Sequence, residues 1–206
     1  PPSKLTMNRT GHPGLYVHVP FCKTKCPYCD FYSVLGTEHA GKWLKAVLGE
    51  ASLNSPEFPR FDSLYIGGGT PSLLDDDEVE GLIAGLRGVF RFDDTTEVTI
   101  ELNPDDVTKE KLALYRSLGV NRVSLGVQSF DGDEVRFLGR RHSGRQAEEA
   151  ARLVAEAGFA EFGIDLIYGL PGQTVRSWRK TLRLALSYGP AHLSCYQLTV
   201  EGDTPF

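Results

Sequence analysis

The chain has 206 residues, of which 41% are hydrophobic and 24% charged, and this composition is ordinary for a soluble globular protein with one substantial core. Its 27 acidic and 22 basic side chains give a net charge of -5, which excludes an overall positive field that would attract nucleic acid or anionic lipid. No apolar run approaches the roughly 18 residues of a membrane helix, and residues 1–14 lack the apolar centre of a signal peptide. We therefore expect a cytoplasmic protein without nucleic-acid partners or a membrane-spanning segment.

Strands and helices are predicted to alternate along the chain. The strands appear as short apolar or alternating runs, and the helices as segments with apolar residues at helical spacing, capping residues and terminal glycines. Predicted strands cover residues 15–19, 63–66, 97–102, 122–128, 161–168 and 191–200. Predicted helices cover residues 38–53, 108–118, 143–158 and 174–187, with two more beginning near residues 75 and 131.

The alternation of side chains along the strands indicates a hollow barrel. On the third predicted strand, Val98, Ile100 and Leu102 share one face, while Thr99 and Glu101 share the other. The next two strands repeat this division into an apolar face and a small or polar face. An open doubly wound sheet is the alternative, but its strands are usually continuous apolar runs. We predict an α/β fold, a partial (β/α)6 barrel of parallel strands with outer helices and a polar interior.

Three of the four cysteines lie in one loop directly after the first predicted strand. Cys22, Cys26 and Cys29 form a CxxxCxxC motif, and soft thiolate ligands favour iron–sulfur clusters or zinc. A structural zinc site normally has four protein ligands, whereas a four-iron cluster on three cysteines leaves one iron open for a small molecule. The remaining Cys195 lies in the sixth predicted strand, where we expect a small buried hydrophobic side chain rather than a fourth ligand.

Other polar segments also follow predicted strands. Gly68 and Gly69 offer bare backbone to a ligand, and Thr70 adds a hydroxyl. Glu101 and Asp165 place two carboxylates near the ends of the third and fifth strands, on the polar face. Because the carboxyl ends of parallel strands meet at one end of a barrel, we expect these groups to lie near the cysteine loop and to bind a ligand's ammonium or ribose.

The cysteine motif and its flanks, Tyr16–Phe21 and Asp30–Phe31, resemble the radical S-adenosylmethionine (SAM) superfamily. Within it, the chain is similar to the oxygen-independent coproporphyrinogen III oxidase-like family. The similar segments are residues 67–71, 101–104, 126–130, 138–140, 165–171 and 199–206. This resemblance also implies a six-unit partial barrel, independently of the strand pattern.

The resemblance implies two cofactors and a set of residues for each. Cys22, Cys26 and Cys29 would hold a 4Fe-4S cluster. The positions that match SAM-binding residues of the family are Tyr16, Tyr28, Gly68, Gly69, Thr70, Glu101, Gln128, Arg140, Asp165 and Thr199. Among them, a guanidinium suits the methionine carboxylate because it can donate two parallel hydrogen bonds.

Several neighbouring residues are given simpler interpretations. We interpret Asn103-Pro104 as a turn and Arg141 as a solvated surface cation. His18 shares a strand face with Tyr16 and is either a site residue or a satisfied core histidine. His142 is interpreted as a polar group at a helix end.

One departure from the family pattern separates its branches. The coproporphyrinogen oxidases carry a further cysteine two residues after the third, and this chain has Phe31 there. The sequence therefore resembles the haem-chaperone branch, whose members bind haem and deliver it to other proteins. A genuine radical SAM oxidoreductase, such as an oxygen-independent coproporphyrinogen III oxidase, is the alternative, and a structural zinc module is a third interpretation.

The resemblance also sets expectations for domains and partners. We expect a flexible N-terminal segment over residues 1–14 and a radical SAM core over 15–206, with the family's C-terminal domain absent. Haem would bind through a histidine-containing motif of that domain, so the haem site is expected outside this chain. The implied partners are SAM, haem or another tetrapyrrole, an electron donor such as a flavodoxin or ferredoxin, and haem-accepting proteins. Reductive SAM cleavage is the implied enzymatic step, and the sequence leaves its occurrence open.

Overall fold

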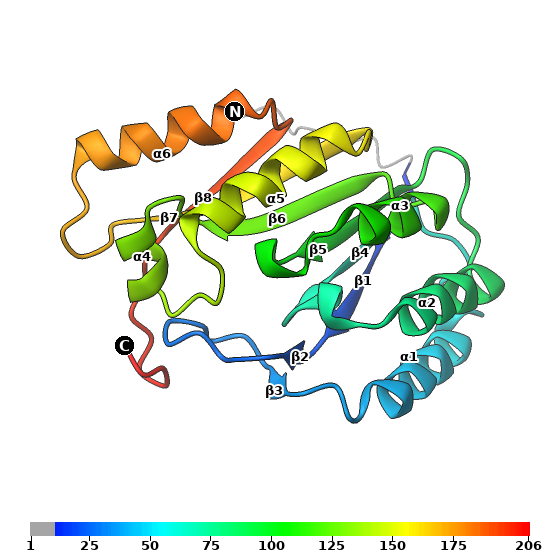
Figure 1. Ribbon diagram of the computed structural model, residues 1–206. Helices are drawn as coiled ribbons and strands as arrows, with labels where there is room; N and C mark the ends of the chain where they lie inside the picture. The colour runs from blue at the N-terminus through cyan, green and yellow to red at the C-terminus, as the bar shows by residue number, and fades with distance from the viewer. Residues whose placement is uncertain (1–10) are drawn as a thin grey trace, which may run out of the picture.

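The computed structural model describes residues 11–206 and contains one six-stranded sheet with helices on its outside (Figure 1). Its strands follow the order β1-β4-β5-β6-β7-β8, and every neighbouring pair is parallel. The strands are β1 (Gly14–Val19), β4 (Ser63–Gly68), β5 (Glu97–Leu102), β6 (Arg122–Gln128), β7 (Glu161–Tyr168) and β8 (His192–Gln197). Because β1 and β8 are the two edges, the barrel is open between them, and the predicted partial (β/α)6 barrel is confirmed.

Helices connect the strands and cover the outer face of the sheet. In Figure 1, α1 and α2 lie side by side near β1 and β4, while α5 and α6 lie near β6, β7 and β8. The helices are α1 (Ala40–Asn54), α2 (Asp76–Val89), α3 (Lys109–Ser117), α4 (Gly132–Phe137), α5 (Gly144–Glu156) and α6 (Val175–Ser187). Short elements that the sequence did not predict are the parallel pair β2 (Phe21–Cys22) and β3 (Val34–Leu35), and the 3-10 turns η1 (Pro71–Leu73) and η2 (Pro104–Asp106).

Local capping signals determine where several helices begin and end. Asp75 and Ser143 each accept a hydrogen bond from the backbone N–H three residues later and form complete capping boxes for α2 and α5. Thr174 caps α6 in the same way. Gly119 and Gly158 follow α3 and α5 with φ of 83° and 77°, a left-handed conformation that glycine adopts without strain. These ends agree with the sequence prediction because they depend on residues only a few positions apart.

The two faces of the sheet have different surroundings. On β5, Val98, Ile100 and Leu102 are at most 3% exposed and belong to the main apolar core beneath the helices. Burying a side chain of this kind contributes about 1.5–3 kcal/mol. The opposite face carries Thr99 and Glu101, and the latter lines the cavity described below. The predicted apolar exterior and polar interior are therefore both present.

The last strand differs from the prediction. β8 ends at Gln197 rather than at residue 200, and Cys195 is exposed rather than buried, so that prediction was wrong. The reason is that β8 is an edge strand with a single neighbour, β7, and most of its residues are exposed.

The predicted flexible segment at residues 1–14 falls largely on residues 1–10, which lie outside the described residues, and β1 already begins at Gly14. Within residues 11–206, no helix combines the length and the apolar character that a membrane crossing requires.

Candidate functional site

A cavity of about 450 Å³ opens at the carboxyl ends of the strands. The cysteine loop forms one wall, and every strand from β4 to β8 supplies residues from its end or from the loop that follows. All the predicted site residues except Tyr16 line this cavity: Cys22, Cys26, Cys29, Tyr28, Gly68, Gly69, Thr70, Glu101, Gln128, Arg140, Asp165 and Thr199. The fold thus brings together residues that are up to 177 positions apart in the chain (22 to 199).

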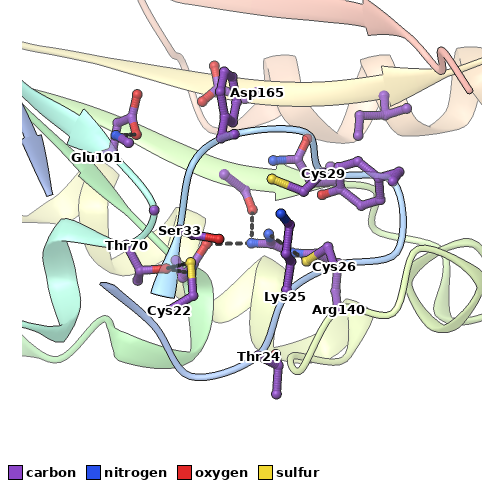
Figure 2. A pocket seen from close by; sticks show the side chains of 18 of the residues that line it. Cys22, Thr24, Lys25, Cys26, Cys29, Ser33, Thr70, Glu101, Arg140 and Asp165 are labelled. Carbon is purple, nitrogen blue, oxygen red and sulfur yellow. Dashed lines mark hydrogen bonds between the residues drawn. The ribbon is translucent and has the colours of Figure 1, made fainter. Parts of the chain in front are cut away.

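The three motif cysteines are free and half-buried at the cavity wall. Two of their sulfur atoms receive hydrogen bonds from other loops, as Figure 2 shows. The Thr70 hydroxyl donates to Cys22 Sγ at 3.6 Å, and Arg140 Nη1 donates to Cys26 Sγ at 3.7 Å. Hydrogen-bond donors of this kind stabilise a thiolate and suit a metal-ligand role.

These residues fit an iron–sulfur cluster by the chemistry of the donor set. In the part of the chain that the structure describes, no three His, Cys, Asp or Glu side chains converge closely enough to hold a single metal ion. A cluster takes each cysteine on a different iron, so its ligand sulfurs need not meet at one point. Three thiols with donors around two of them, beside a cavity, match this requirement.

The glycine segment after β4 lies close to the cysteine loop. A Cβ atom on Gly69 would lie 2.8 Å from the Phe21 carbonyl oxygen and 3.0 Å from Cys22 Sγ. Gly68 has a φ of 119°, and a Cβ there would lie 2.6 Å from a ring nitrogen of His18. Only glycine permits this close approach, so packing against the cysteine loop and His18 requires glycine at both positions.

Glu101 is held by two donors at the inner face of the barrel. The Tyr65 hydroxyl donates to Oε1 at 2.7 Å, and the Gly68 N–H donates to Oε2 at 3.0 Å. Burial raises the pKa of Glu101, while these two hydrogen bonds oppose that effect. Asp165 on β7 accepts from the Ser124 hydroxyl at 2.9 Å. Both carboxylates are therefore fixed in orientation, as a site that recognises polar ligand groups requires.

Gln128 has an unusual backbone conformation at the end of β6. Its φ is 65°, the only positive value for a non-glycine residue among residues 11–206. The pairing of β6 with β7 also shifts register between Leu125 and Gln128, which marks a bulge. Such strain is concentrated at ligand sites, where it directs a side chain that a regular strand would place elsewhere.

Tyr16 lies apart from the other predicted residues. Its side chain is exposed outside the cavity lining, and its hydroxyl is 2.9 Å from Nδ1 of His18. Nε2 of the same histidine is bonded to the Tyr32 carbonyl, so His18 is a satisfied residue beside the site. A role for Tyr16 in SAM binding stays a prediction.

Sequence reasoning missed the segment after β5. Asn103, interpreted as part of a turn, contacts both Thr70 and Arg140 and lines the cavity. Arg141, interpreted as a solvated cation, forms an ion pair with Asp105. The available signal was the position of Asn103, two residues after the inward-facing Glu101, but its partners come from other loops and no local pattern reveals them.

His142 is buried beside the site and predicts a pH dependence of stability. It is 2% exposed, its Nε2–H donates to the Val127 carbonyl at 3.1 Å, and Nδ1 has no hydrogen-bond partner among residues 11–206. Burial, aided by the Arg140 cation, lowers the pKa of His142 to about 4. As pH falls from about 6.5 towards 4, His142 becomes protonated in the unfolded chain but stays neutral in the folded protein. The free energy of unfolding therefore falls by roughly 3 kcal/mol over this range.

His142→Gln should remove this part of the pH dependence of stability, because a glutamine amide can keep the hydrogen bond to Val127 without titrating. Denaturant unfolding at several pH values between 4 and 7 measures the free energy of unfolding of both proteins. A variant with the same pH dependence as the wild-type protein would show that His142 is not its source.

Comparison with known proteins identifies the family. Residues 16–185 match the model of the radical SAM superfamily. The chain belongs to this superfamily. It is 37% identical to the haem chaperone HemW of Haemophilus influenzae over 205 residues and 38% identical to that of Escherichia coli over 197. Each alignment covers 93% of this chain and 52% of the relative, so the chain spans about half the length of these curated relatives.

Solved structures of this radical SAM fold are also similar. Coproporphyrinogen III oxidase (HemN) from E. coli, described as a radical SAM enzyme, matches with a TM-score of 0.84 and 33% identity over 92% of this chain and 44% of its own. Streptococcus suis SuiB bound to S-adenosylmethionine matches with a TM-score of 0.66 at 17% identity over 95% of this chain and 43% of its own, a likeness of fold alone. The predicted resemblance to the coproporphyrinogen oxidase-like family and its haem-chaperone branch is confirmed.

Proposed function

We propose that this chain is the cluster- and SAM-binding core of a haem chaperone. The observation that carries the proposal is the cavity in which three free thiols lie opposite Glu101 and Asp165, with Arg140 beside them. Membership of the radical SAM superfamily supports the two cofactors, and similarity to proteins named haem chaperones supports the wider role.

Each part of the cavity has a role in this proposal. Cys22, Cys26 and Cys29 hold a 4Fe-4S cluster, which when bound supplies an electron for reductive cleavage of the SAM sulfonium. Gly68 and Gly69 allow SAM to approach the backbone, and the Thr70 hydroxyl donates to Cys22 in the cysteine loop. The remaining contacts to its polar groups are assigned to Tyr16, Tyr28, Glu101, Gln128, Arg140, Asp165 and Thr199. Half-burial of the cysteines limits access of water and oxygen to the cluster.

The three bonds that Arg140 makes use one N–H of Nη1 and both of Nη2, so no parallel pair of donors is free for a ligand. Its Nη1 donates to Cys26, and its Nη2 donates to Asn103 and to the Gly126 carbonyl. A two-pronged bond to the SAM carboxylate would require some of these bonds to be exchanged. We therefore propose that the main role of Arg140 is to bind the cysteine loop, and that contact with the methionine carboxylate is its secondary role.

The chaperone role is distinguished from the enzyme alternative by one position. Phe31, which is 68% exposed at the cavity, stands where coproporphyrinogen oxidases have a further cysteine. The similarity to coproporphyrinogen III oxidase at 33% identity supports keeping that oxidoreductase as the alternative. The partners we propose are haem or another tetrapyrrole, haem-accepting proteins, and an electron donor such as a flavodoxin or ferredoxin. A reducing cytoplasm suits the four free cysteines.

Anaerobic reconstitution of the full-length protein, followed by haem titration and by assays with dithionite, tests this proposal. We expect iron and sulfide incorporation, SAM binding, stoichiometric haem binding and haem transfer to an acceptor apoprotein, with no conversion of coproporphyrinogen III. Conversion of coproporphyrinogen III without haem transfer would favour the oxidoreductase. Formation of 5′-deoxyadenosine would show that SAM is cleaved, and stoichiometric zinc without iron would refute the cluster.

The same titration on residues 1–206 locates the haem site. We expect haem to bind the full-length protein and not this fragment. Equal haem affinity of the two proteins would place the haem site within residues 1–206.

A further inference from the structure

We propose that Asn103 is a positioning residue that orients the hydrogen-bond donors on two of the three cluster cysteines. The inference rests on the proposed cluster at Cys22, Cys26 and Cys29. Asn103 lies between β5 and η2, and its side-chain amide contacts Thr70 on one side and Arg140 on the other. Those two residues are the ones that donate to Cys22 and Cys26.

The chemistry of arginine determines how the Asn103 amide is oriented. A guanidinium has only donors, so the atom of Asn103 that faces Arg140 Nη2 must be the acceptor Oδ1. The Nδ2 group then faces Thr70, and it lies 3.1 Å from Oγ1. The other amide orientation would place N–H groups against a donor, so this network excludes it.

The orientation of the amide in turn directs the threonine proton. Since Asn103 Nδ2 donates to the Thr70 oxygen, the single hydroxyl proton is free to point elsewhere. The sulfur of Cys22, 3.6 Å from Oγ1, is the acceptor that the structure places there. Thr70 is 5% exposed, so water does not compete effectively for this proton.

The other side of the amide acts on Cys26 in the same way. Nη2 of Arg140 is held by Asn103 Oδ1 and by the Gly126 carbonyl at 3.0 Å. With that end of the planar guanidinium fixed, Nη1 is directed at the sulfur of Cys26, 3.7 Å away. One asparagine therefore connects an O–H donor on one thiol with an N–H donor on another.

The backbone around Asn103 is itself fixed by a buried polar network. Its N–H donates to the Ser72 hydroxyl at 3.2 Å, and that hydroxyl donates to Asp106 at 3.0 Å. Asp106, whose side chain is 4% exposed, also pairs at 2.8 Å with Lys23, the residue after Cys22. The amide and the cysteine loop are thus anchored to the same carboxylate.

Donors directed at cysteine sulfur atoms have an electronic consequence. Hydrogen bonds to the sulfurs of an iron–sulfur cluster withdraw electron density and stabilise its reduced form, which raises its reduction potential. In this structure, Asn103 controls two of these bonds without contacting a cysteine. It should therefore influence the potential at which the cluster accepts an electron.

A double-variant cycle on the full-length, reconstituted protein tests whether Asn103 acts on Cys22 through the Thr70 hydroxyl. We call this chain of contacts, Asn103–Thr70–Cys22, the relay. Asn103→Asp keeps the acceptor for Arg140 but replaces the Nδ2–H donor by an oxygen, which captures the Thr70 proton. Thr70→Val removes that proton directly and nearly preserves shape. The measurement is the cluster midpoint potential, from an anaerobic redox titration followed by electron paramagnetic resonance, together with iron content.

We expect both single variants to shift the potential to more negative values, and the double variant to resemble Asn103→Asp alone. If Asn103→Asp acted only through its added charge, its shift and that of Thr70→Val would add in the double variant. A double variant that shifts no further than Asn103→Asp alone therefore identifies the relay. Thr70→Ser should keep the wild-type potential because the hydroxyl remains. Asn54→Asp, the same substitution at an exposed helix end, should also leave the potential unchanged.

Additive shifts, or single variants with the wild-type potential, would overturn the role of Asn103 and leave the proposed cluster intact. If Asn103→Asp fails to retain the cluster, Thr70→Val and Thr70→Ser decide the matter: a shift only in the valine variant supports the relay, and equal potentials refute it. A wild-type protein that incorporates no iron would refute the proposed function, and this inference with it.

Discussion

Cys26→Ala is expected to abolish the iron–sulfur cluster and to reduce the iron content of the anaerobically reconstituted protein to background. The chain supplies only three thiols at this loop, and each is needed because no other cysteine of residues 11–206 lines the cavity. The substitution also removes the sulfur atom to which Arg140 Nη1 donates a hydrogen bond. Visible absorbance after reconstitution and iron analysis measure the effect.

Cys195→Ala is the matched control. This cysteine lies exposed on β8, outside the cavity lining, so its removal should leave the iron content and the visible spectrum unchanged. Wild-type iron content in Cys26→Ala, or loss of the cluster in Cys195→Ala, would contradict the ligand assignment.

Gly69→Ala is expected to have the second large effect, a loss of cluster binding without a change at any cysteine. The added methyl group would lie within 3.0 Å of backbone atoms of Pro20 and Phe21, and at 3.0 Å from Cys22 Sγ. Backbone atoms cannot move aside as a flexible side chain does, so the cysteine loop must shift. We expect a destabilisation of about 1–3 kcal/mol, as for overpacked cores, together with poor incorporation of iron.

Gly88→Ala provides the comparison for this substitution. Gly88 lies in α2, and a Cβ there would meet no atom of the described residues within 4 Å. Alanine in an exposed helix is favoured over glycine by up to about 1 kcal/mol, so this variant should be slightly more stable and should bind a normal amount of iron. Denaturant unfolding and iron analysis of both variants test the pair. Normal cluster incorporation by Gly69→Ala would show that the loop tolerates the displacement.

The amino-acid sequence by itself was sufficient for the fold and for the cysteine motif. Alternation along β5 and β6, the capping residues Asp75 and Ser143, and the glycines after α3 and α5 are local signals, and each depends on a few neighbouring positions. Parallel strands then bring their carboxyl ends together, which made it possible to predict that Glu101 and Asp165 would share a cavity with the cysteine loop.

The tertiary structure was needed for every contact between loops. The sequence could not reveal that Asn103 joins Thr70 to Arg140, or that Asp105 pairs with Arg141, because these partners lie 33 to 37 positions apart in the chain. Their meeting depends on strand register and on the short turns η1 and η2, which have no periodic signal. Nor could it reveal the exposure of Cys195, which follows from the position of β8 at the sheet edge.

In the cysteine loop, too, some properties follow from the sequence and others only from the tertiary structure. Spacing determined that its three thiols could serve a metal centre, since ligand type and separation are properties of the chain. Which donors reach their sulfurs, and from which strand ends, was decided only when the barrel brought those loops together, because hydrogen bonds require atoms within a few ångströms and correct orientation.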